Sequence, residues 1–334
     1  MKKTIVALAV AALAATSANA ATVFNQDGTK VDLNGSVRLL LEKSKDKRTD
    51  LKDNGSRISL KGSHDLGGGL SALAYSELRF SSKTGFGDKV QLKRLYAGFG
   101  YEGVGTLTFG KQLTIGDKIG YSDYSYLYGG VGKPLPDGER AINFTSASFN
   151  GFSFGAAYVF EDNTAKIAER TGRGVVVAGL YERQMGDLGF KLATAYSEQK
   201  VDINADLNPR PIDVDLRKEK TFKVATELAY GPVSVGVDYI HARTTGVDSK
   251  ERAIELGAQY QVTEMAKLYA VASQGKTGTK ADYVKKRGLV LGAGYKLHKN
   301  VETFLEAGWT KEKDETGTVS ARGRNVGLGL RVHF

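Results

Sequence analysis

Four histidines and one glycine-rich stretch are the residues of this chain whose types could support catalysis or metal binding. His64, His241, His298 and His333 lie far apart, and no spacing among them is that of a metal site. The stretch "GTLTFGKQ" at 105–112 matches G-x-x-x-x-G-K, but Gln follows where a phosphate-binding loop has Ser or Thr. It also lies on an expected strand with no helix after it. We therefore predict no metal and no cofactor.

Nucleophilic catalysis has little support in the chain. There is no cysteine, so no disulfide and no thiol-based redox or metal chemistry is expected. No constellation of Ser, His and an acidic residue is recognisable, although a hydrolase carried by a barrel would need only a nucleophile and a base within reach. We predict that the protein is not an enzyme, with that minor alternative left open.

Alternation of apolar and polar residues is the dominant pattern. In 221–230, for example, Phe222, Val224, Leu228 and Tyr230 share one face, whereas Lys223 and other small or polar residues occupy the opposite one. The same period of two recurs in the following stretches: 31–41, 152–160, 233–239, 289–297 and 301–309. Such alternation is typical of β-strands with a single apolar face.

Counting these runs predicts sixteen strands, of which 140–149 and 174–185 alternate least regularly. The predicted ranges are 30–42, 56–65, 70–80, 92–101, 104–111, 140–149, 152–161, 174–185, 188–199, 220–230, 233–243, 251–261, 266–274, 286–297, 301–311 and 323–334. Short glycine-rich turns alternate along the chain with long, charged connections such as 43–55 and 200–219. This order is expected of antiparallel hairpins joined around a ring.

The first twenty residues predict a cleaved signal peptide. Lys2 and Lys3 precede an apolar run, and Ala18-Asn19-Ala20 supplies a small-residue cleavage site. Residues 21–334 then form a single predicted domain, in which no run approaches the ~18 apolar residues of a membrane helix. A secreted β-sandwich and a membrane β-barrel both remain open at this point.

Three features favour a sixteen-stranded antiparallel transmembrane β-barrel. The expected strands have about ten residues, which suits ~9–11 tilted residues across a bilayer. Their second face is rich in glycine and charge, as a water-filled lumen requires, and a barrel of this size leaves a channel. Aromatic residues gather at the ends of the apolar faces, where outer-membrane barrels carry their girdles. These aromatics are Tyr101, Phe160, Tyr196, Tyr230, Tyr239, Tyr260, Trp309 and Phe334. The architecture predicts a passive pore.

The sequence resembles the general diffusion porins of Gram-negative outer membranes, and within them the major porin of the Pasteurellaceae type. The resemblance is carried by "ATVFNQDGTKVDLNGSVRL", "SRISLKG", "LKRLYAGFGYEGVGTLTFGKQ", "GYSDYSYLYGG" and the terminal Phe. It implies an outer-membrane homotrimer whose third loop, 112–139, folds into each lumen. It also implies passage of ions and small hydrophilic solutes, and contact with lipid, lipopolysaccharide and the barrel assembly machinery.

The resemblance further implies a row of basic residues on the lumen wall. By position, Arg57 in "SRISLKG" and Arg94 in "LKRLYAG" match this row, and Arg140 in "GERAINF" matches a third arginine. Ser36 stands where many family members have a lysine. Arg38, two residues further along the same face, could replace that missing charge.

Carboxylates on the third loop are implied to face this basic row. Asp123 in "GYSDY" matches an acidic position, and Asp117, Asp137 and Glu139 could supply others. Leu127 stands where an acidic residue normally precedes the aromatic-Gly-Gly motif, which puts the usual cation preference in doubt. Opposite rows of charge would create a transverse field that orients polar solutes and tunes ion preference.

Two other functions stay open beside general diffusion. One is a solute-selective or anion-selective porin, given the basic excess of the chain. The other is a surface-binding adhesin with a plugged lumen. In the final stretch, "VGLGLRVHF", we expect every second residue from Val326 to Phe334 to face outward. Arg331 and His333, which lie between them, should face the lumen. The resemblance implies that Phe334 is an assembly signal, so its deletion should impair assembly more than conductance.

Overall fold

The computed structural model describes residues 21–81, 86, 89–160, 172–202 and 216–334. The predicted signal peptide, 1–20, lies outside the described residues. In the described part of the chain, no helix is long and apolar enough to cross a membrane.

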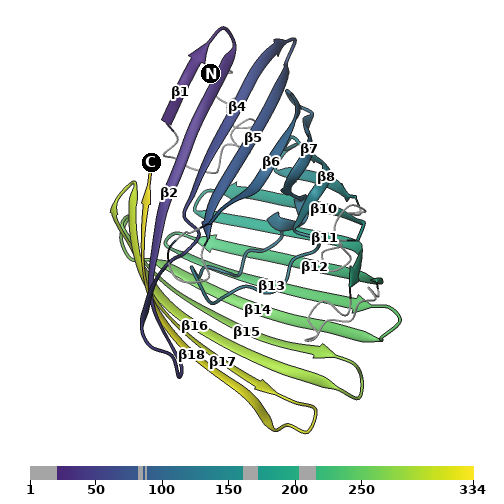
Figure 1. Cartoon of the computed structure of the whole chain (residues 1–334), viewed down its shortest axis with the longest axis vertical. Coiled ribbons are helices and arrows are strands. Elements are labelled where there is room, and N and C mark those ends of the chain that lie inside the picture. Colours follow the sequence, from purple (N-terminus) through teal and green to yellow (C-terminus); the bar gives the residue numbers. More distant parts are fainter. Residues whose placement is uncertain (1–20, 82–85, 87–88, 161–171, 203–215) are drawn as a thin grey trace.

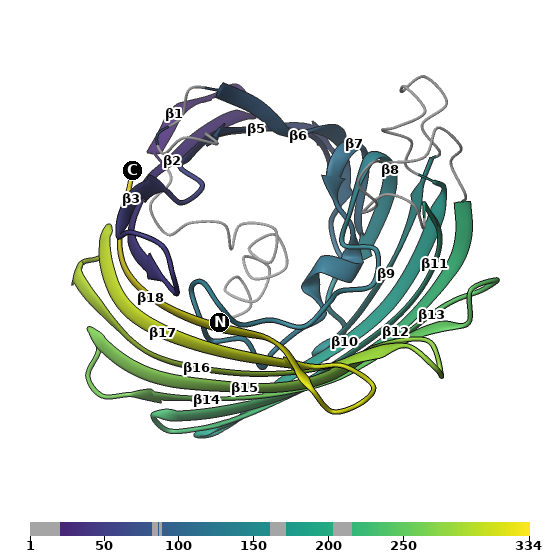
Figure 2. The same ribbon diagram turned by 60° about the horizontal axis from the view of Figure 1, so that its bottom comes forward.

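Sixteen strands of the described chain form a closed antiparallel barrel (Figures 1 and 2). Each strand pairs with its neighbours in the ring, and β18 pairs with β2 to close it. The sixteen are β2 (Thr29–Ser44), β4 (Arg57–Gly67), β5 (Leu70–Ser81), β6 (Lys89–Tyr101), β7 (Gly105–Leu113), β8 (Asp137–Ser146), β9 (Phe152–Val159), β10 (Gly174–Met185), β11 (Leu188–Asp202), β12 (Leu216–Tyr230), β13 (Val233–Thr244), β14 (Ser249–Gln261), β15 (Ala266–Gly278), β16 (Tyr283–His298), β17 (Val301–Lys313) and β18 (Val319–His333).

The predicted sixteen-stranded antiparallel barrel is confirmed, with two short additions. β1 (Ala21–Gln26) pairs with the start of β2, beyond the point where the β18–β2 pairing stops. β3 (Asp50–Asp53) pairs with the other end of β2. Neither stretch shows a long alternation, because each contributes only a few residues to the ladder. Both extend the hydrogen bonding of β2 where its main neighbours do not reach.

The two faces of the barrel wall differ as the alternation predicts. In β18, Val326, Leu328 and Leu330 are exposed on the outside, whereas Gly327 and Gly329 between them are buried. Exposed large apolar residues of this kind occur on strands all around the ring. An apolar surface that surrounds the whole barrel suits contact with lipid and is not that of a soluble β-sandwich.

Phe334 extends the pairing of β18 with β2 by one residue. Its N–H donates to the carbonyl of Gly35 at 3.0 Å, and its carbonyl accepts from the Gly35 N–H at 2.7 Å. A Cβ on Gly35 would lie 2.1 Å from the Phe334 ring atom Cε2. The absence of a side chain at Gly35 therefore allows the Phe334 ring to lie flat against β2.

We expect Gly35→Val to displace the Phe334 ring and to lower the free energy of unfolding by about 1–3 kcal/mol, the cost of overpacking. The measurement is urea unfolding of the barrel in lipid vesicles. Gly62→Val is the matched control, because a Cβ on Gly62 in β4 meets nothing within 4 Å. Equal stability of the two variants would contradict this account of Gly35.

Candidate functional site

The segment between β7 and β8 crosses the inside of the ring of strands (Figure 2). It begins with a short 3-10 helix, η1 (Ile115–Lys118), which Thr114 caps by accepting a hydrogen bond from the Gly116 N–H. Ile115 and Ile119 are fully buried, in one apolar cluster with Val176 of β10. The first half of the segment is therefore fixed to the wall by apolar packing.

Carboxylates of the wall hold the second half of this segment. Oδ1 of Asp238 on β13 accepts hydrogen bonds from the backbone N–H groups of Tyr121 at 2.9 Å and Ser122 at 3.2 Å. Glu255 on β14 accepts from the Ser122 hydroxyl and from the Gly130 N–H, both at 2.9 Å. Charge-assisted bonds of this kind are stronger than neutral ones, so they restrict the loop backbone.

Glu306 on β17 binds the tip of the segment. Its two carboxylate oxygens accept the backbone N–H groups of Tyr126 at 2.7 Å, Leu127 at 3.1 Å and Tyr128 at 2.8 Å. The Tyr269 hydroxyl donates to the same carboxylate at 2.7 Å. Glu306 is fully buried, and these four donors replace the water that its charge would otherwise need.

Three loop tyrosines reach further carboxylates. Tyr124 donates to Glu227 at 2.7 Å, Tyr128 donates to Glu42 at 2.8 Å, and Tyr126 donates to Glu302. Burial raises the pKa of each of these hydroxyls, and the carboxylate that accepts its hydrogen bond raises the pKa further. The tyrosines therefore stay protonated and remain donors at neutral pH.

One buried ion pair supports the anchoring at β13. Lys223 Nζ of β12 lies 2.9 Å from Asp238 Oδ2, and both side chains are almost completely buried. The same ammonium donates to the carbonyl oxygen of Gly132 at 3.1 Å. Lys223 thus balances the charge of Asp238 and contacts the returning part of the segment.

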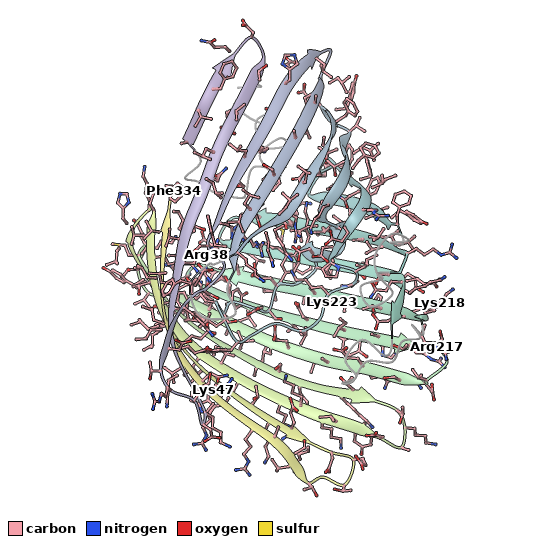
Figure 3. The ribbon with its side chains drawn as sticks, viewed as in Figure 1. Arg38, Lys47, Arg217, Lys218, Lys223 and Phe334 are labelled. Carbon is pink, nitrogen blue, oxygen red and sulfur yellow. The ribbon has the colours of Figure 1, made fainter. Side chains whose placement is uncertain are left out.

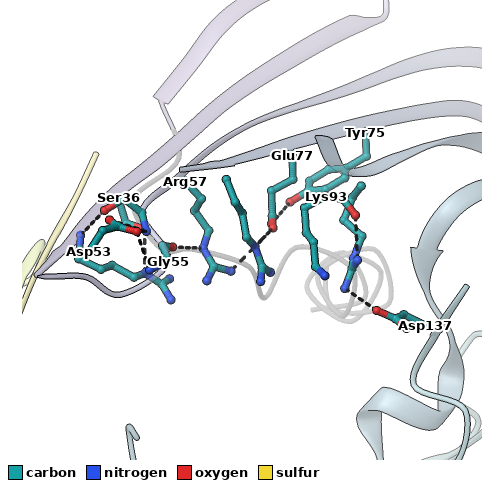
Figure 4. Close-up of polar contacts among 12 residues, drawn as sticks. Ser36, Asp53, Gly55, Arg57, Tyr75, Glu77, Lys93 and Asp137 are labelled. Atoms are coloured by element: carbon teal, nitrogen blue, oxygen red, sulfur yellow. Dashed lines mark hydrogen bonds and ion pairs between the residues drawn. The ribbon is translucent and has the colours of Figure 1, made fainter. Parts of the chain in front are cut away.

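Arg38 of β2, Arg57 of β4 and Arg94 of β6 lie on one inner wall, because their strands are neighbours and the register brings them close together. Figure 4 shows this wall with Arg57 labelled. Arg38 Nε donates to the Ser36 hydroxyl at 3.0 Å, and Ser36 lies directly opposite Arg57 in the ladder. Arg38 therefore lies beside Ser36, the position at which the resemblance implies a lysine.

Sequence reasoning missed two further basic residues of this row. Arg79 lies directly opposite Arg57, and its Nε donates to Glu77 at 2.6 Å. A β-bulge in β6 leaves Lys93 without a partner in the ladder, since Leu92 and Arg94 pair with consecutive residues of β5. The bulge turns the Lys93 side chain to the same wall as Arg57 (Figure 4), where strict alternation would not place it.

Arg140 is placed differently from these arginines. It is exposed on β8, and it precedes the buried Ala141. Two residues after Ala141, Asn143 accepts a hydrogen bond from the Ile115 N–H on the loop at 3.1 Å. The alternation of β8 thus assigns Ala141 and Asn143 to the inner face and Arg140 to the other face.

Two predicted carboxylates lie within the loop. Asp117 pairs with Lys133 at 2.9 Å, and the same ammonium also donates to the Asp117 carbonyl. Asp123 is exposed and accepts hydrogen bonds from the N–H and hydroxyl of Ser125. Asp117 is therefore largely neutralised by Lys133, whereas the Ser125 groups that contact Asp123 are neutral.

The other two predicted carboxylates lie at the start of β8. Asp137 Oδ2 is 3.6 Å from Arg94 Nη2, so it directly meets the basic row (Figure 4). Glu139 lies 2.8 Å from Lys111 of β7. The structure thus brings one of the four predicted carboxylates, Asp137, into contact with a predicted arginine.

The anchoring carboxylates Asp238, Glu255 and Glu306 were not among the predicted site residues. Their only sequence signal is a position on the polar face of an alternating strand. Many other charged residues share that signal, and the alternation does not say which of them the loop will reach. Their role depends on a contact across the lumen between residues more than 100 positions apart.

The stretch 151–155, Gly-Phe-Ser-Phe-Gly, matches the G-x-S-x-G pattern of hydrolase nucleophiles. Its Ser153 lies within β9, in a register that pairs it with Leu180. A nucleophile of this class requires a sharp strand-to-helix turn. The match therefore has no structural support.

Comparison with known proteins finds a protein family that matches this sequence and solved structures that share its fold. Residues 7–315 match the model of the Gram-negative porin family. The chain is 58% identical to the major outer membrane protein of Pasteurella multocida strain Pm70, over 84% of this chain and 85% of that protein.

Solved structures of low sequence identity share the fold. A loop L8 deletion mutant of OmpT, an outer membrane protein of Vibrio cholerae, is 20% identical, with a TM-score of 0.75 over 92% of this chain and 100% of that one. The trimer form of OmpT is 18% identical, with a TM-score of 0.74 over 92% and 100% of the two chains.

We expect Glu306→Gln to loosen the tip of the loop, because one amide oxygen must replace two carboxylate oxygens that accept four bonds. Each bond to the charged group contributes about 1.5–3 kcal/mol. The measurement is single-channel current in a planar bilayer, in which a mobile loop produces extra open-channel noise. Glu312→Gln is the control, since Glu312 lies on the same strand and pairs with Lys286 at 3.5 Å, with no bond to the loop among the described residues. Equal noise in both variants would argue against the anchoring role.

Proposed function

The chain belongs to the Gram-negative porin family, and we propose that its lumen passes small anionic solutes more readily than cations. As a member of this family, the barrel is an outer-membrane channel for diffusion. The charge of the inner wall and of the loop is the observation that carries the proposed preference.

The basic groups outnumber the carboxylates on the wall of β2 to β6. Five basic residues line the wall of β2 to β6: Arg38, Arg57, Arg79, Lys93 and Arg94. Arg57 and Lys93 are labelled in Figure 4. The carboxylates in contact with this row are Glu77, next to two of the arginines, and Asp137, next to one. On the loop, the carboxylate of Asp117 already pairs with a lysine. The balance of charge along this wall is therefore positive.

The anchored loop explains how this charge acts on solutes. The carboxylates of β13, β14 and β17 hold one side of the loop. The other side of the loop is therefore left to face the basic row across the remaining gap. Water in a narrow gap between low-dielectric walls screens charge less well than bulk water, so fixed charges act strongly on passing ions. A solute with a phosphate or carboxylate group would be attracted, while a cation would meet a barrier.

We also propose the assembly that the porin family suggests. OmpT forms a trimer, and a homotrimer would bury part of the exposed apolar wall. The outer face of β4 to β7 suits such contact, since small residues form a shallow hollow there between larger apolar ones. Lipopolysaccharide and the barrel assembly machinery are the other proposed partners, with Phe334 as the assembly signal.

We expect wild-type protein in a planar bilayer to give a reversal potential that favours chloride over potassium in a KCl gradient. Arg57→Gln combined with Arg94→Gln should shift this potential toward potassium, and Asp123→Asn should shift it further toward chloride. The preference should weaken at high salt, because the Debye length falls to about 3 Å at 1 M.

Arg322→Gln is the control, because Arg322 lies on the outer face of β18 and should leave the potential unchanged. A wild-type preference for potassium would overturn the anion proposal. An absence of any conductance would instead favour the adhesin alternative.

A further inference from the structure

Two arginines face each other at the seam where β18 closes the barrel on β2. Arg331 of β18 lies directly opposite Arg38 of β2 in the ladder. Both side chains are half-buried on the inner face, whereas Val332, next to Arg331, is exposed on the outer face. Figure 3 shows Arg38 between the levels of Lys47 and Phe334 along the barrel. We call Arg38 and Arg331 the seam pair.

The charge of the seam pair is not balanced by the described chain. Glu302 of β17 lies directly opposite Arg331, but its carboxylate accepts the hydroxyl of Tyr126 on the loop. Within the described residues, no carboxylate forms an ion pair with either arginine. Arg38 Nε donates to the neutral hydroxyl of Ser36, and Arg331 Nε is buried with no hydrogen-bond partner in the described part of the chain.

A second like-charged pair on the same wall is balanced. Arg57 and Arg79 also lie directly opposite each other, and like charges in this arrangement repel. Glu77 offsets this repulsion, since its Oε1 lies 2.6 Å from Arg79 Nε and 3.9 Å from Arg57 Nη1. The chain thus supplies an anion to one pair and not to the other. An anionic solute at the seam pair would do there what Glu77 does for its neighbours.

Aromatic rings hold the guanidinium of Arg331. Its Cζ lies 4.7 Å from the centre of the Tyr126 ring and 5.1 Å from that of the Phe304 ring. The two rings stack with their centres 4.2 Å apart and their planes 7° apart. Cation–π contact fixes a guanidinium without using its N–H groups as hydrogen-bond donors. Arg331 is therefore held in place while its donors stay available to a ligand.

The seam pair lies beyond the tip of the loop, toward the C-terminal end of the barrel. Glu306 holds the backbone of Tyr126 and lies opposite Gly327 of β18. Arg331 is further along the same strand, between Gly327 and Phe334. A solute that has passed between the loop and the basic row therefore meets the seam pair next.

The basic row leads directly to the seam pair. Arg57 lies opposite Ser36, whose hydroxyl accepts the hydrogen bond from Arg38, and Arg38 lies opposite Arg331. A further cation is close, since Lys267 Nζ lies 4.5 Å from the centre of the same Tyr126 ring that Arg331 contacts. An anion can thus move from the row to the seam pair without leaving positive charge.

The chemistry of two facing guanidinium groups selects the kind of anion. Opposite residues of neighbouring antiparallel strands have Cα atoms about 4.5–5.5 Å apart, so the two side chains can converge on one group. A guanidinium binds phosphate or carboxylate through two parallel hydrogen bonds. A phosphate monoester has about −1.5 to −2 charges at pH 7 and three acceptor oxygens, enough for two such groups. A single carboxylate has one charge and two oxygens.

We propose that the seam pair binds the phosphate group of small phosphate monoesters, such as sugar phosphates, as they pass through the lumen. The proposal rests on the anion preference proposed above and assigns to it a class of solute and a binding site. Arg38 and Arg331 are the residues that determine the preference for a doubly charged group. Tyr126 and Phe304 position Arg331 and do not bind the solute.

The test is the current through single channels in a planar bilayer at about 0.1 M KCl, where the Debye length is about 10 Å. Glucose 6-phosphate should block the wild-type channel reversibly, at a lower concentration than gluconate, which has a similar size and one charge. Arg331→Gln should raise the half-blocking concentration of glucose 6-phosphate roughly tenfold. Arg331→Lys keeps the charge without the fork of donors and should raise it by a smaller factor.

Lys191→Gln is the matched control. It removes one cation from the inner face of β11, where Lys191 pairs with Glu227 at 2.9 Å, and should block as the wild type does. Equal half-blocking concentrations in Arg331→Gln and Lys191→Gln would overturn the proposal, as would equal block of the wild type by gluconate and glucose 6-phosphate. If Arg331→Gln forms no channels, Arg38→Gln takes its place with the same expected loss.

The reversal potential of the same wild-type channels in a KCl gradient separates this proposal from the anion preference. A preference for potassium, together with block that depends on Arg331, would contradict the anion preference and leave the binding site standing. A preference for chloride, with block that is unchanged in Arg331→Gln, would support the anion preference and overturn the binding site.

Discussion

Hydrocarbon offers no water to unpaired backbone N–H and C=O groups, and this constraint governs the rest of the structure. A sheet can meet it only by closing on itself, which the pairing of β18 with β2 achieves. Closure makes one face of every strand an outside and the other an inside. The short strand β1 and the pairing of Phe334 with Gly35 extend the hydrogen bonding at the seam.

The inside of the barrel uses charge in two different ways. On one wall, carboxylates accept hydrogen bonds from the loop and are thereby satisfied, as Glu306 is by four donors. On the other wall, arginines lie beside one another with few carboxylates. The first arrangement holds the loop, and the second is the basis of the proposed anion preference. The proposed selectivity would therefore depend on the anchoring carboxylates as well as on the arginines.

The outside shows a related division. Apolar residues cover the wall where lipid chains lie, and on β14 to β18 they give way abruptly to unpaired cations. The same alternation that places Lys286 in the lumen with a carboxylate partner places Lys285 and Arg287 on the outside without one. The side of the wall on which a charged residue lies thus follows from local parity alone.

The alternation along the chain, as in β16 and β18, was enough to predict strands and their inner and outer faces, because side-chain direction in a strand depends only on local parity. The number and length of these strands, with a polar inner face, then predicted a sixteen-stranded barrel. Arg57 and Arg94 could be assigned to one wall by resemblance, and their neighbours Arg79 and Lys93 could not. Lys93 depends on a bulge, and Arg79 on a register between strands. The meeting of Glu306 with Tyr126 was decided only by the tertiary structure, since it joins residues far apart in sequence across a closed ring. Local periodicity determines which way a side chain points, but closure and register determine what it meets.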